Sequence, residues 1–317
     1  FNKALSILNA ASADPLNLEL KGLSYLNQAS TAFSLQKFEL AKELYQKSAE
    51  IWPHLKEIGY GDFRDRTALA QMNTGNVYYR KSDYSKAIYY MKASCEIWEE
   101  LISETNSVVS RQNHAQVLIN LSAVYHESGA SEMALETIGK SMSILRNLVQ
   151  NEGRKDMIPW LAMSCLNYGN FALSAGQYAQ AIGVLDQAIA LYENLVNKEN
   201  LINHIDSLQK SLITRSNCLV EMGQIDTAIK QFEAVIPDIE DHIKDENNIN
   251  RLPFYFSTVR KLAKLYQQQS RTSRAEQCLK KLIDRFDGHD IILNYPEHAK
   301  EFARVVRDME RLTESLQ

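Results

Sequence analysis

The sequence has little proline, glycine and cysteine, and it has no long apolar run. Only 6 Pro and 12 Gly occur in 317 residues, and because both residue types disfavour helix interiors, their scarcity favours a mostly helical chain. No stretch of about 18 apolar residues is present, so we expect no membrane span. Charge is nearly balanced, with 35 basic against 39 acidic residues, which does not indicate a nucleic-acid-binding or membrane-surface protein.

Motifs for metal binding and catalysis are also missing. The four cysteines lie far apart in the sequence, each on a predicted apolar helix face, so we expect buried free thiols, a reducing compartment and a cytoplasmic location. The histidines form no pair at ligand spacing on one helix. No Gly-rich phosphate loop, nucleophile elbow or paired-carboxylate motif occurs. The sequence therefore predicts no metal, no cofactor, no catalytic residue and no enzymatic activity.

What the sequence does contain is a repeat. An alanine recurs at steps of 46, 47, 47, 47 and 47 residues, with a small residue 12 positions before it and a larger apolar residue 4 positions after it. Short turn patterns such as Ser82-Asp83 and Ala175-Gly176 precede most of these alanines. We expect two helices joined by a tight turn, which approach closely where the small residues meet. The reference alanines are Ala41, Ala87, Ala134, Ala181, Ala228 and Ala275.

The residues at these recurring positions, which we call the columns of the repeat, resemble those of the tetratricopeptide repeat family. The resemblance is carried by Gly75 to Tyr79 with Tyr84 and Ala87, by Ser122 to Tyr125 with Gly129 and Ala134, and by Tyr168 to Asn170 with Gly176, Tyr178, Ala181 and Ala188. The family's usual repeat is about 34 residues, which is shorter than the repeat here. Its common proline after the second helix is matched only by Pro53. We therefore expect helices lengthened to about 20 residues, with a bulky apolar residue buried just before that position.

The resemblance implies an all-α, right-handed superhelical solenoid of about six long helix-turn-helix repeats over residues 13–290. Residues 1–12 match the end of a second helix, so they are expected to be the remnant of a preceding repeat in a longer protein. Residues 291–317 are expected to form a C-terminal capping helix, or alternatively the first half of a seventh pair. Repeat one is expected to end at Pro53, with a loop over residues 54–65.

The resemblance also implies that the first helix of each pair lines an inner, concave wall. Polar residues recur on this helix 14 and 11 positions before the alanine, and such a spacing of three places them on one helix face. An amide can donate and accept, so a row of amides could hold the backbone of an extended peptide. The alternative is that these amides are hydrated or cap local backbone. The candidate binding residues are Asn27, Asn73, Asn76, Asn120, Asn167, Asn170 and Asn217.

Two further candidates come from charge and aromatic residues. Residues 221–250 hold eight acids against two bases, and residues 251–285 hold nine bases against two acids. Arg260, Lys261 and Lys264 lie on the predicted inner wall of repeat six, where they could attract an acidic peptide or a nucleic-acid backbone. The alternative is a solvated face neutralised by the acidic repeat. Tyr79, in a tyrosine cluster of repeat two, is placed toward the groove, although packing is the alternative that the pattern favours.

The leading functional prediction is a non-catalytic scaffold or sensor module that binds a peptide or protein partner in its concave groove. Repeats of this length are similar to the arrays attached to bacterial signalling ATPases and caspase-like proteases, and more loosely to kinesin light chain. This resemblance implies an attached or associated effector domain within a larger signalling or regulatory protein. The alternative is a nucleic-acid-binding solenoid that uses the basic sixth repeat, and the lack of a continuous basic stripe argues against it.

Overall fold

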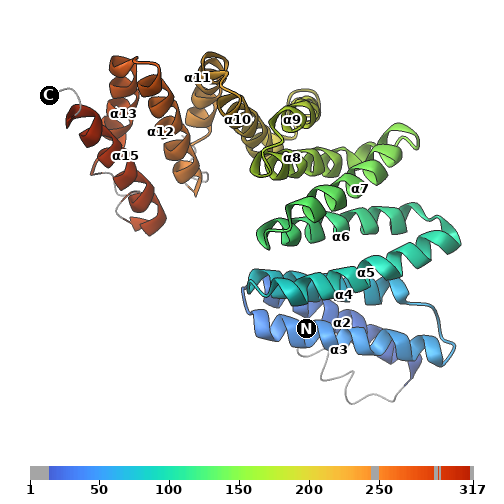
Figure 1. Cartoon of the computed structure of the whole chain (residues 1–317). Helices are drawn as coiled ribbons and strands as arrows, with labels where there is room; N and C mark the ends of the chain where they lie inside the picture. The colour runs from blue at the N-terminus through green and yellow to red at the C-terminus, as the bar shows by residue number, and fades with distance from the viewer. Residues whose placement is uncertain (1–13, 244–249, 289–291, 293, 315–317) are drawn as a thin grey trace. The chain divides into compact units, whose positions relative to one another are not determined.

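The computed structural model describes residues 14–243, 250–288, 292 and 294–314 (Figure 1). This part of the chain consists of helices and short connections, without a strand, so the predicted all-α class is confirmed. The chain divides into two compact units, residues 1–175 and 176–317, and the boundary falls in the turn of repeat four. The predicted remnant helix over residues 1–12 lies outside the described residues.

Unit 1 is a stack of antiparallel helix pairs. Each first helix packs on the second helix of its own repeat, and each second helix then packs on the next first helix, as Figure 1 shows for the layers from α2 to α7. Its helices are α2 (Pro15–Ser34), α3 (Phe38–Glu57), α4 (Arg64–Arg80), α5 (Tyr84–Thr105), α6 (Val108–Glu127), α7 (Ser131–Gln150) and α8 (Ile158–Ser174).

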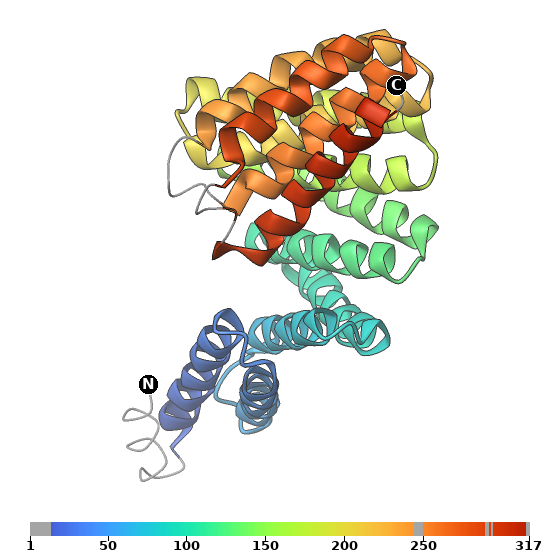
Figure 2. The same ribbon diagram turned by 90° about the vertical axis from the view of Figure 1, so that its left-hand side faces the viewer.

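Unit 2 continues the alternation and ends on a single helix. Helix α15 lies across α12 and α13 (Figure 2) and buries Phe302, Val305 and Leu312. Whether it serves as a cap or as half of a seventh pair stays a prediction. The helices of unit 2 are α9 (Tyr178–Glu193), α10 (Ile205–Glu221), α11 (Ile225–His242), α12 (Leu252–Gln268), α13 (Thr272–Phe286) and α15 (Pro296–Glu314).

The repeat columns predicted from the sequence form the core. All six reference alanines are fully buried, and so are the small residues 12 positions before them and the apolar residues 4 positions after them. A Cβ added to Gly75 would lie 2.7 Å from Cγ of Met91 and 3.2 Å from the carbonyl oxygen of Ala87. Glycine therefore allows an approach that a larger residue would block. The bulky column is also buried, as predicted, at Trp52, Trp98, Leu145, Tyr192, Ile239 and Phe286.

The turn inside every repeat has the same backbone conformation. The residue five positions before the alanine has a positive φ in all six repeats: glycine in three of them, and Gln36, Ser82 and Ser270, with φ of 58°, 59° and 56°, in the others. The next N–H bonds back to a carbonyl of the first helix, as from Asp83 to Tyr78 at 2.9 Å. This is the Schellman-type ending that satisfies the last carbonyls of a helix.

A further buried column joins the two helices of repeats one to three. It consists of serines seven positions after the alanine, whose hydroxyls donate to carbonyl oxygens 26 residues earlier, on the first helix. These buried serines are fully enclosed, so each provides a polar link inside an otherwise apolar contact. The bonds run from Ser48 to Gly22 at 3.0 Å, from Ser94 to Ala68 at 2.7 Å and from Ser141 to Ala115 at 2.9 Å.

The predicted end of repeat one at Pro53 is wrong. Helix α3 continues through Pro53 to Glu57, and the connection to α4 spans only residues 58–63. A proline in a helix removes one hydrogen bond, but Trp52 and Leu55 on either side of it are buried, and their packing keeps the helix continuous. The expected uniform length of about 20 residues also varies, because α13 has 15 residues and α5 has 22.

Candidate functional site

The first helices of unit 1 form one continuous layer. Helix α2 contacts α4, α4 contacts α6, and α6 contacts α8, whereas successive second helices contact one another less. Closer contact on one side is what the inner side of a curved stack requires. The predicted amides of α2, α4, α6 and α8 therefore belong to one layer of one unit.

The amides of this layer lack partners. Asn27 is exposed, and Asn73, Asn76, Asn120 and Asn167 are half-buried. Within the described residues, none of these five side chains has a hydrogen-bond partner. They do not cap local backbone, which was one part of the alternative interpretation. Half-buried amides that are free to donate and accept can bind a peptide backbone.

The remaining two predicted amides have different surroundings. Asn170 is half-buried and interacts with other residues of the chain. Asn217, in unit 2, accepts a hydrogen bond at its Oδ1 from Nζ of Lys261, 3.3 Å away. The row of free amides is therefore a feature of unit 1.

Tyr79 lies at the end of α4 and is half-buried. Its ring centroid is 6.3 Å from that of Tyr84, and burial raises the pKa of its hydroxyl, with a smaller contribution from the carboxylate of Glu127 on α6. Its neighbours Tyr78 and Tyr90 stack on each other at 5.4 Å. Tyr79 thus packs against Tyr84, and the part of its side chain that remains exposed lies near α6, the first helix of the next repeat.

Most bases of repeat six are already paired. Four ion pairs connect α13, together with Arg271 just before it, to the acidic α11, so the two opposite charge blocks of the sequence face each other. Arg260, one of the predicted inner-wall residues, pairs with Asp308 at 2.7 Å and Glu301 at 3.5 Å on α15. The four pairs with α11 are Arg271 with Asp226 (2.7 Å), Arg274 with Glu233 (3.4 Å), and Lys281 (3.1 Å) and Arg285 (2.6 Å) with Glu240.

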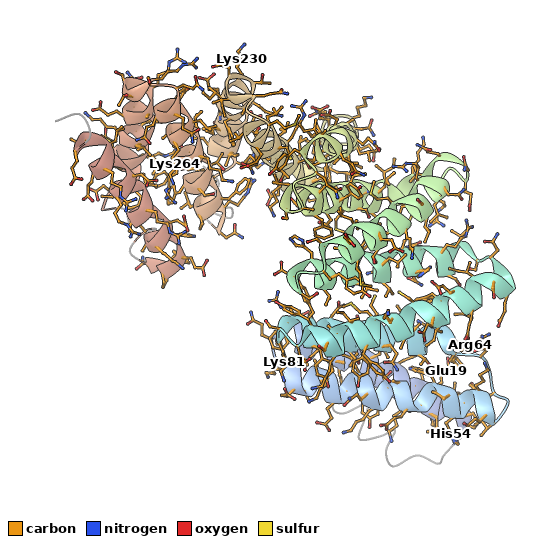
Figure 3. All side chains as sticks on the ribbon, in the orientation of Figure 1. Glu19, His54, Arg64, Lys81, Lys230 and Lys264 are labelled. Carbon is orange, nitrogen blue, oxygen red and sulfur yellow. The ribbon has the colours of Figure 1, made fainter. Side chains whose placement is uncertain are left out.

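The other two predicted bases remain exposed on α12. Lys261 bonds to Asn217, and protein atoms around its ammonium group lower its pKa by desolvation. Lys264 (Figure 3) has no ion-pair partner among the described residues. Two exposed lysines on one helix do not form the continuous basic stripe that a nucleic-acid backbone requires.

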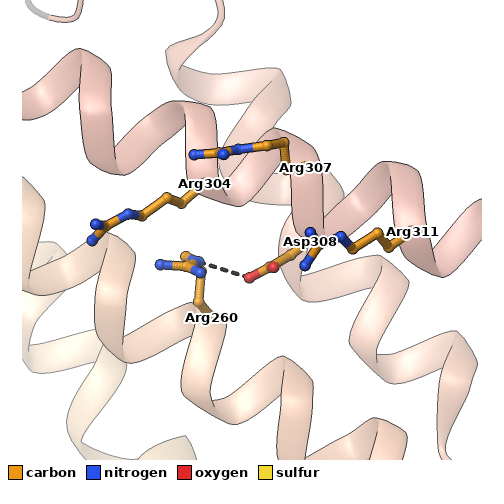
Figure 4. Close-up of a pocket in the computed structure, with 5 residues that line it drawn as sticks. All are labelled: Arg260, Arg304, Arg307, Asp308 and Arg311. Carbon is orange, nitrogen blue, oxygen red and sulfur yellow. Dashed lines mark hydrogen bonds and ion pairs between the residues drawn. The ribbon is translucent and has the colours of Figure 1, made fainter.

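The sequence analysis missed a cluster of arginines on one face of α15. Arg304, Arg307 and Arg311 of α15 surround a cavity of ≈ 240 Å³ together with Arg260 and Asp308 (Figure 4). The spacing of three and four residues that places them on one helix face was visible in the sequence. Only the structure shows that Arg260, more than 40 residues earlier, joins them.

The predicted free thiols are confirmed. Cys95, Cys165 and Cys218 are buried, and Cys278 is half-buried. Burial raises the pKa of Cys95 to about 12 and that of Cys165 to about 11. Among the described residues, no three His, Cys, Asp or Glu side chains gather as metal ligands would. No helix in that part of the chain has the length and apolar character needed to cross a membrane.

Comparison with known proteins confirms the predicted resemblance. Residues 21–100 match the tetratricopeptide repeat family. No curated protein matches the sequence of the chain. Many solved structures match its fold, all those named here at low sequence identity.

Three of these structures illustrate the similarity. A signal transduction ATPase with numerous domains and a tetratricopeptide repeat sensor, from Pyrococcus horikoshii, has a TM-score of 0.65 at 16% identity, with 95% of this chain and 42% of that chain covered. The apo form of RapI has a TM-score of 0.58 at 15% identity, covering 92% and 99%. A Rap protein complexed with competence and sporulation factor has a TM-score of 0.53 at 17% identity, covering 99% and 80%. The fold is thus that of a tetratricopeptide-like solenoid.

Proposed function

We propose that this tetratricopeptide-like solenoid is a non-catalytic module that binds an extended peptide or protein segment on the first-helix layer of unit 1. The observation that carries the proposal is the set of free, half-buried amides on α4, α6 and α8. A peptide backbone offers a donor and an acceptor at every residue, so it matches a row of amides whatever its side chains.

Proteins with these repeats generally mediate protein–protein interactions, and the structural similarities support a role of that kind. One similar structure is a Rap protein complexed with competence and sporulation factor. Another is an ATPase whose tetratricopeptide repeat part is a sensor, and this chain covers 42% of it. By analogy, the chain serves as the sensor or scaffold part of a larger signalling or regulatory protein, in the cytoplasm, with an attached or associated effector domain. Nucleic acid is the weaker candidate, since the α13 bases are neutralised by α11.

The test begins with a random peptide display library selected on the full chain. Affinities of the enriched peptides are then measured by fluorescence anisotropy for the wild type and for a triple variant, Asn73→Ala, Asn120→Ala and Asn167→Ala. Each lost hydrogen bond should cost about 0.5–1.5 kcal/mol, so the three together should weaken binding by roughly tenfold to a thousandfold. The matched control replaces three polar side chains on second helices, Gln46, Asn147 and Gln150, with alanine.

Backbone recognition has its own signature. N-methylation of the peptide backbone removes donors without changing the side chains, and it should weaken binding more than alanine substitution of the peptide does. If the amide variant and the control variant bind equally well, the amide face is not the binding surface. The proposal also fails if methylated peptides keep their affinity.

A further inference from the structure

The end of unit 2 carries a concentration of positive charge. Arg304, Arg307 and Arg311 follow one another along a single face of α15, and Arg260 of α12 points into the same space (Figure 4). These four guanidinium groups line a cavity of ≈ 240 Å³ whose only other lining residue is Asp308. Like charges gathered on one helix face repel one another, so the cluster is costly unless something neutralises it.

The carboxylates beside the cavity neutralise only part of this charge. Asp308 accepts a hydrogen bond from Nε of Arg260 at 2.7 Å, and Glu301 pairs with Arg260 at 3.5 Å and with Arg304. The four arginines carry four positive charges and the two carboxylates carry two negative charges, so this group of side chains has a net charge of +2.

Two of the arginines have no acidic partner in the part of the chain that the structure describes. Nε of Arg307 donates to the carbonyl oxygen of Ala303 in its own helix, 3.2 Å away. Arg311 has no ion pair among the described residues. Both guanidinium groups therefore keep most of their donors for a ligand.

The arrangement contrasts with the arginines at and just before α13. Arg271, which precedes α13, and Arg274 and Arg285 on it each pair with an acidic side chain of α11. Arg307 and Arg311 of α15 have no ion pair among the described residues, and they lie at a cavity instead of facing an acidic helix.

We propose that Arg260, Arg304, Arg307 and Arg311 form a binding site for a phosphomonoester, such as a phosphorylated side chain of a protein partner. The planar guanidinium group presents paired donors that match phosphate oxygens in a bidentate manner. A phosphomonoester carries a charge of about −1.5 to −2 at pH 7, which balances the excess charge of the cavity, whereas one carboxylate does not. Asp308 orients Arg260 by accepting the hydrogen bond from its Nε. This site lies within unit 2 and does not depend on the amide face of unit 1.

The experiment measures binding to the full chain by isothermal titration calorimetry. The probes are a phosphoserine peptide flanked by glycine and serine residues, its unphosphorylated and glutamate counterparts, and inorganic phosphate. We expect the phosphoserine peptide to bind at least about tenfold more tightly than the other two peptides. Competition by inorganic phosphate shows that the phosphoryl group is the ligand, and a peptide that binds much more tightly than phosphate shows that the protein partner is its source. Duplex DNA that binds more tightly than the phosphoserine peptide would overturn the proposal in favour of a nucleic-acid backbone.

Two variants separate recognition from folding. Arg307→Gln with Arg311→Gln removes two unpaired cations and breaks no ion pair between helices, so the melting temperature should hold while affinity falls about tenfold or more per arginine. Lys230→Gln with Lys280→Gln, which replaces two exposed lysines on α11 and α13, is the control of equal charge. Asp308→Asn removes the negative charge inside the cavity and should increase affinity, a gain that misfolding cannot produce.

The pH dependence supplies a final check. A phosphomonoester loses part of its charge below its second pKa near 6, so binding should be weaker at pH 5.5 than at pH 7.5. Equal binding of the phosphorylated and unphosphorylated peptides, or an equal loss in the lysine control, would overturn the proposal.

Discussion

Replacing Gly22 with alanine should destabilise unit 1, although alanine is the better helix former. A Cβ at this position would lie 2.5 Å from Cη2 and 2.6 Å from Cζ2 of Trp52. The indole is only 1% exposed, and its Nε1 donates to Oγ of Ser48 at 3.1 Å. The rigid ring therefore cannot move away without breaking a buried hydrogen bond and disturbing its neighbours.

The magnitude follows from two opposing terms. Overpacking a close contact typically costs about 1–3 kcal/mol, and replacing glycine by alanine inside a helix gains about 0.5–1 kcal/mol. Gly139 of α7 is the matched control, because a Cβ there meets no atom within 4 Å. Gly139→Ala should therefore show only the stabilisation that comes from the higher helix propensity of alanine. The difference in unfolding free energy between Gly22→Ala and Gly139→Ala thus isolates the clash, at about 1–3 kcal/mol. It corresponds to about 2–4 °C in melting temperature per kcal/mol for a unit of this size.

Tryptophan fluorescence during urea or thermal unfolding is a suitable assay on the full chain. The three tryptophans, Trp52, Trp98 and Trp160, all belong to unit 1, so their emission reports that unit alone. In a Trp52→Phe background the penalty at Gly22 should shrink, since the smaller ring leaves room for the Cβ. If Gly22→Ala is as stable as Gly139→Ala, the close packing of Trp52 on α2 does not determine the stability of unit 1.

The same fluorescence assay tests three more expectations. Replacing Ser48, Ser94 or Ser141 with alanine should lower the unfolding free energy by about 0.5–1.5 kcal/mol, whereas Ser143→Ala, on the exposed face of α7, should have little effect. Ser82→Gly should stabilise unit 1 by up to about 1 kcal/mol, because glycine adopts the φ of 59° without strain, and a loss of stability would contradict this. Burial lowers the pKa of His114, which outweighs the opposite effect of Glu99, so unit 1 should lose stability as pH falls below about 6.5, where the unfolded histidine takes up its proton. His114→Gln should reduce the difference between pH 7.5 and pH 5.5, and an unchanged difference would assign it to other groups.

The sequence revealed the core because periodic packing leaves a periodic trace. A position that must be small where two helices cross stays small in every repeat, so the alanine columns could be recognised without coordinates. The turn conformation was only partly visible. Glycine marks it in three repeats, but Gln36 and Ser270 adopt the same positive φ because the turn geometry requires it, whatever the side chain. The hydrogen bonds from Ser48, Ser94 and Ser141 to the first helices were not predicted, because a serine occupies this position in only three repeats.

The positions of the candidate binding residues could be predicted from the sequence, but their hydrogen-bond and ion-pair partners could not. Periodicity placed the amides on the first helices, but it could not show that Asn217 is bonded to Lys261 while Asn120 is free. Likewise, the charge blocks over residues 221–250 and 251–285 were plain in the sequence, but their mutual neutralisation depends on α11 facing α13. Pairing is a property of neighbours in space, and a single sequence with a long repeat does not specify it.

The distribution of charge implies that the two proposed surfaces can be distinguished by salt. The amides of unit 1 are neutral, so a peptide held by them should bind with similar affinity at low and high ionic strength. The α15 cavity acts through an excess of guanidinium charge on a partly open surface, where Arg304 is 42% exposed. The Debye length falls from about 30 Å at 0.01 M salt to about 3 Å at 1 M, so phosphopeptide affinity should decline steadily over that range. A single partner that contacts both surfaces would show an intermediate salt dependence, and Arg307→Gln with Arg311→Gln should abolish that dependence while leaving the amide contribution intact.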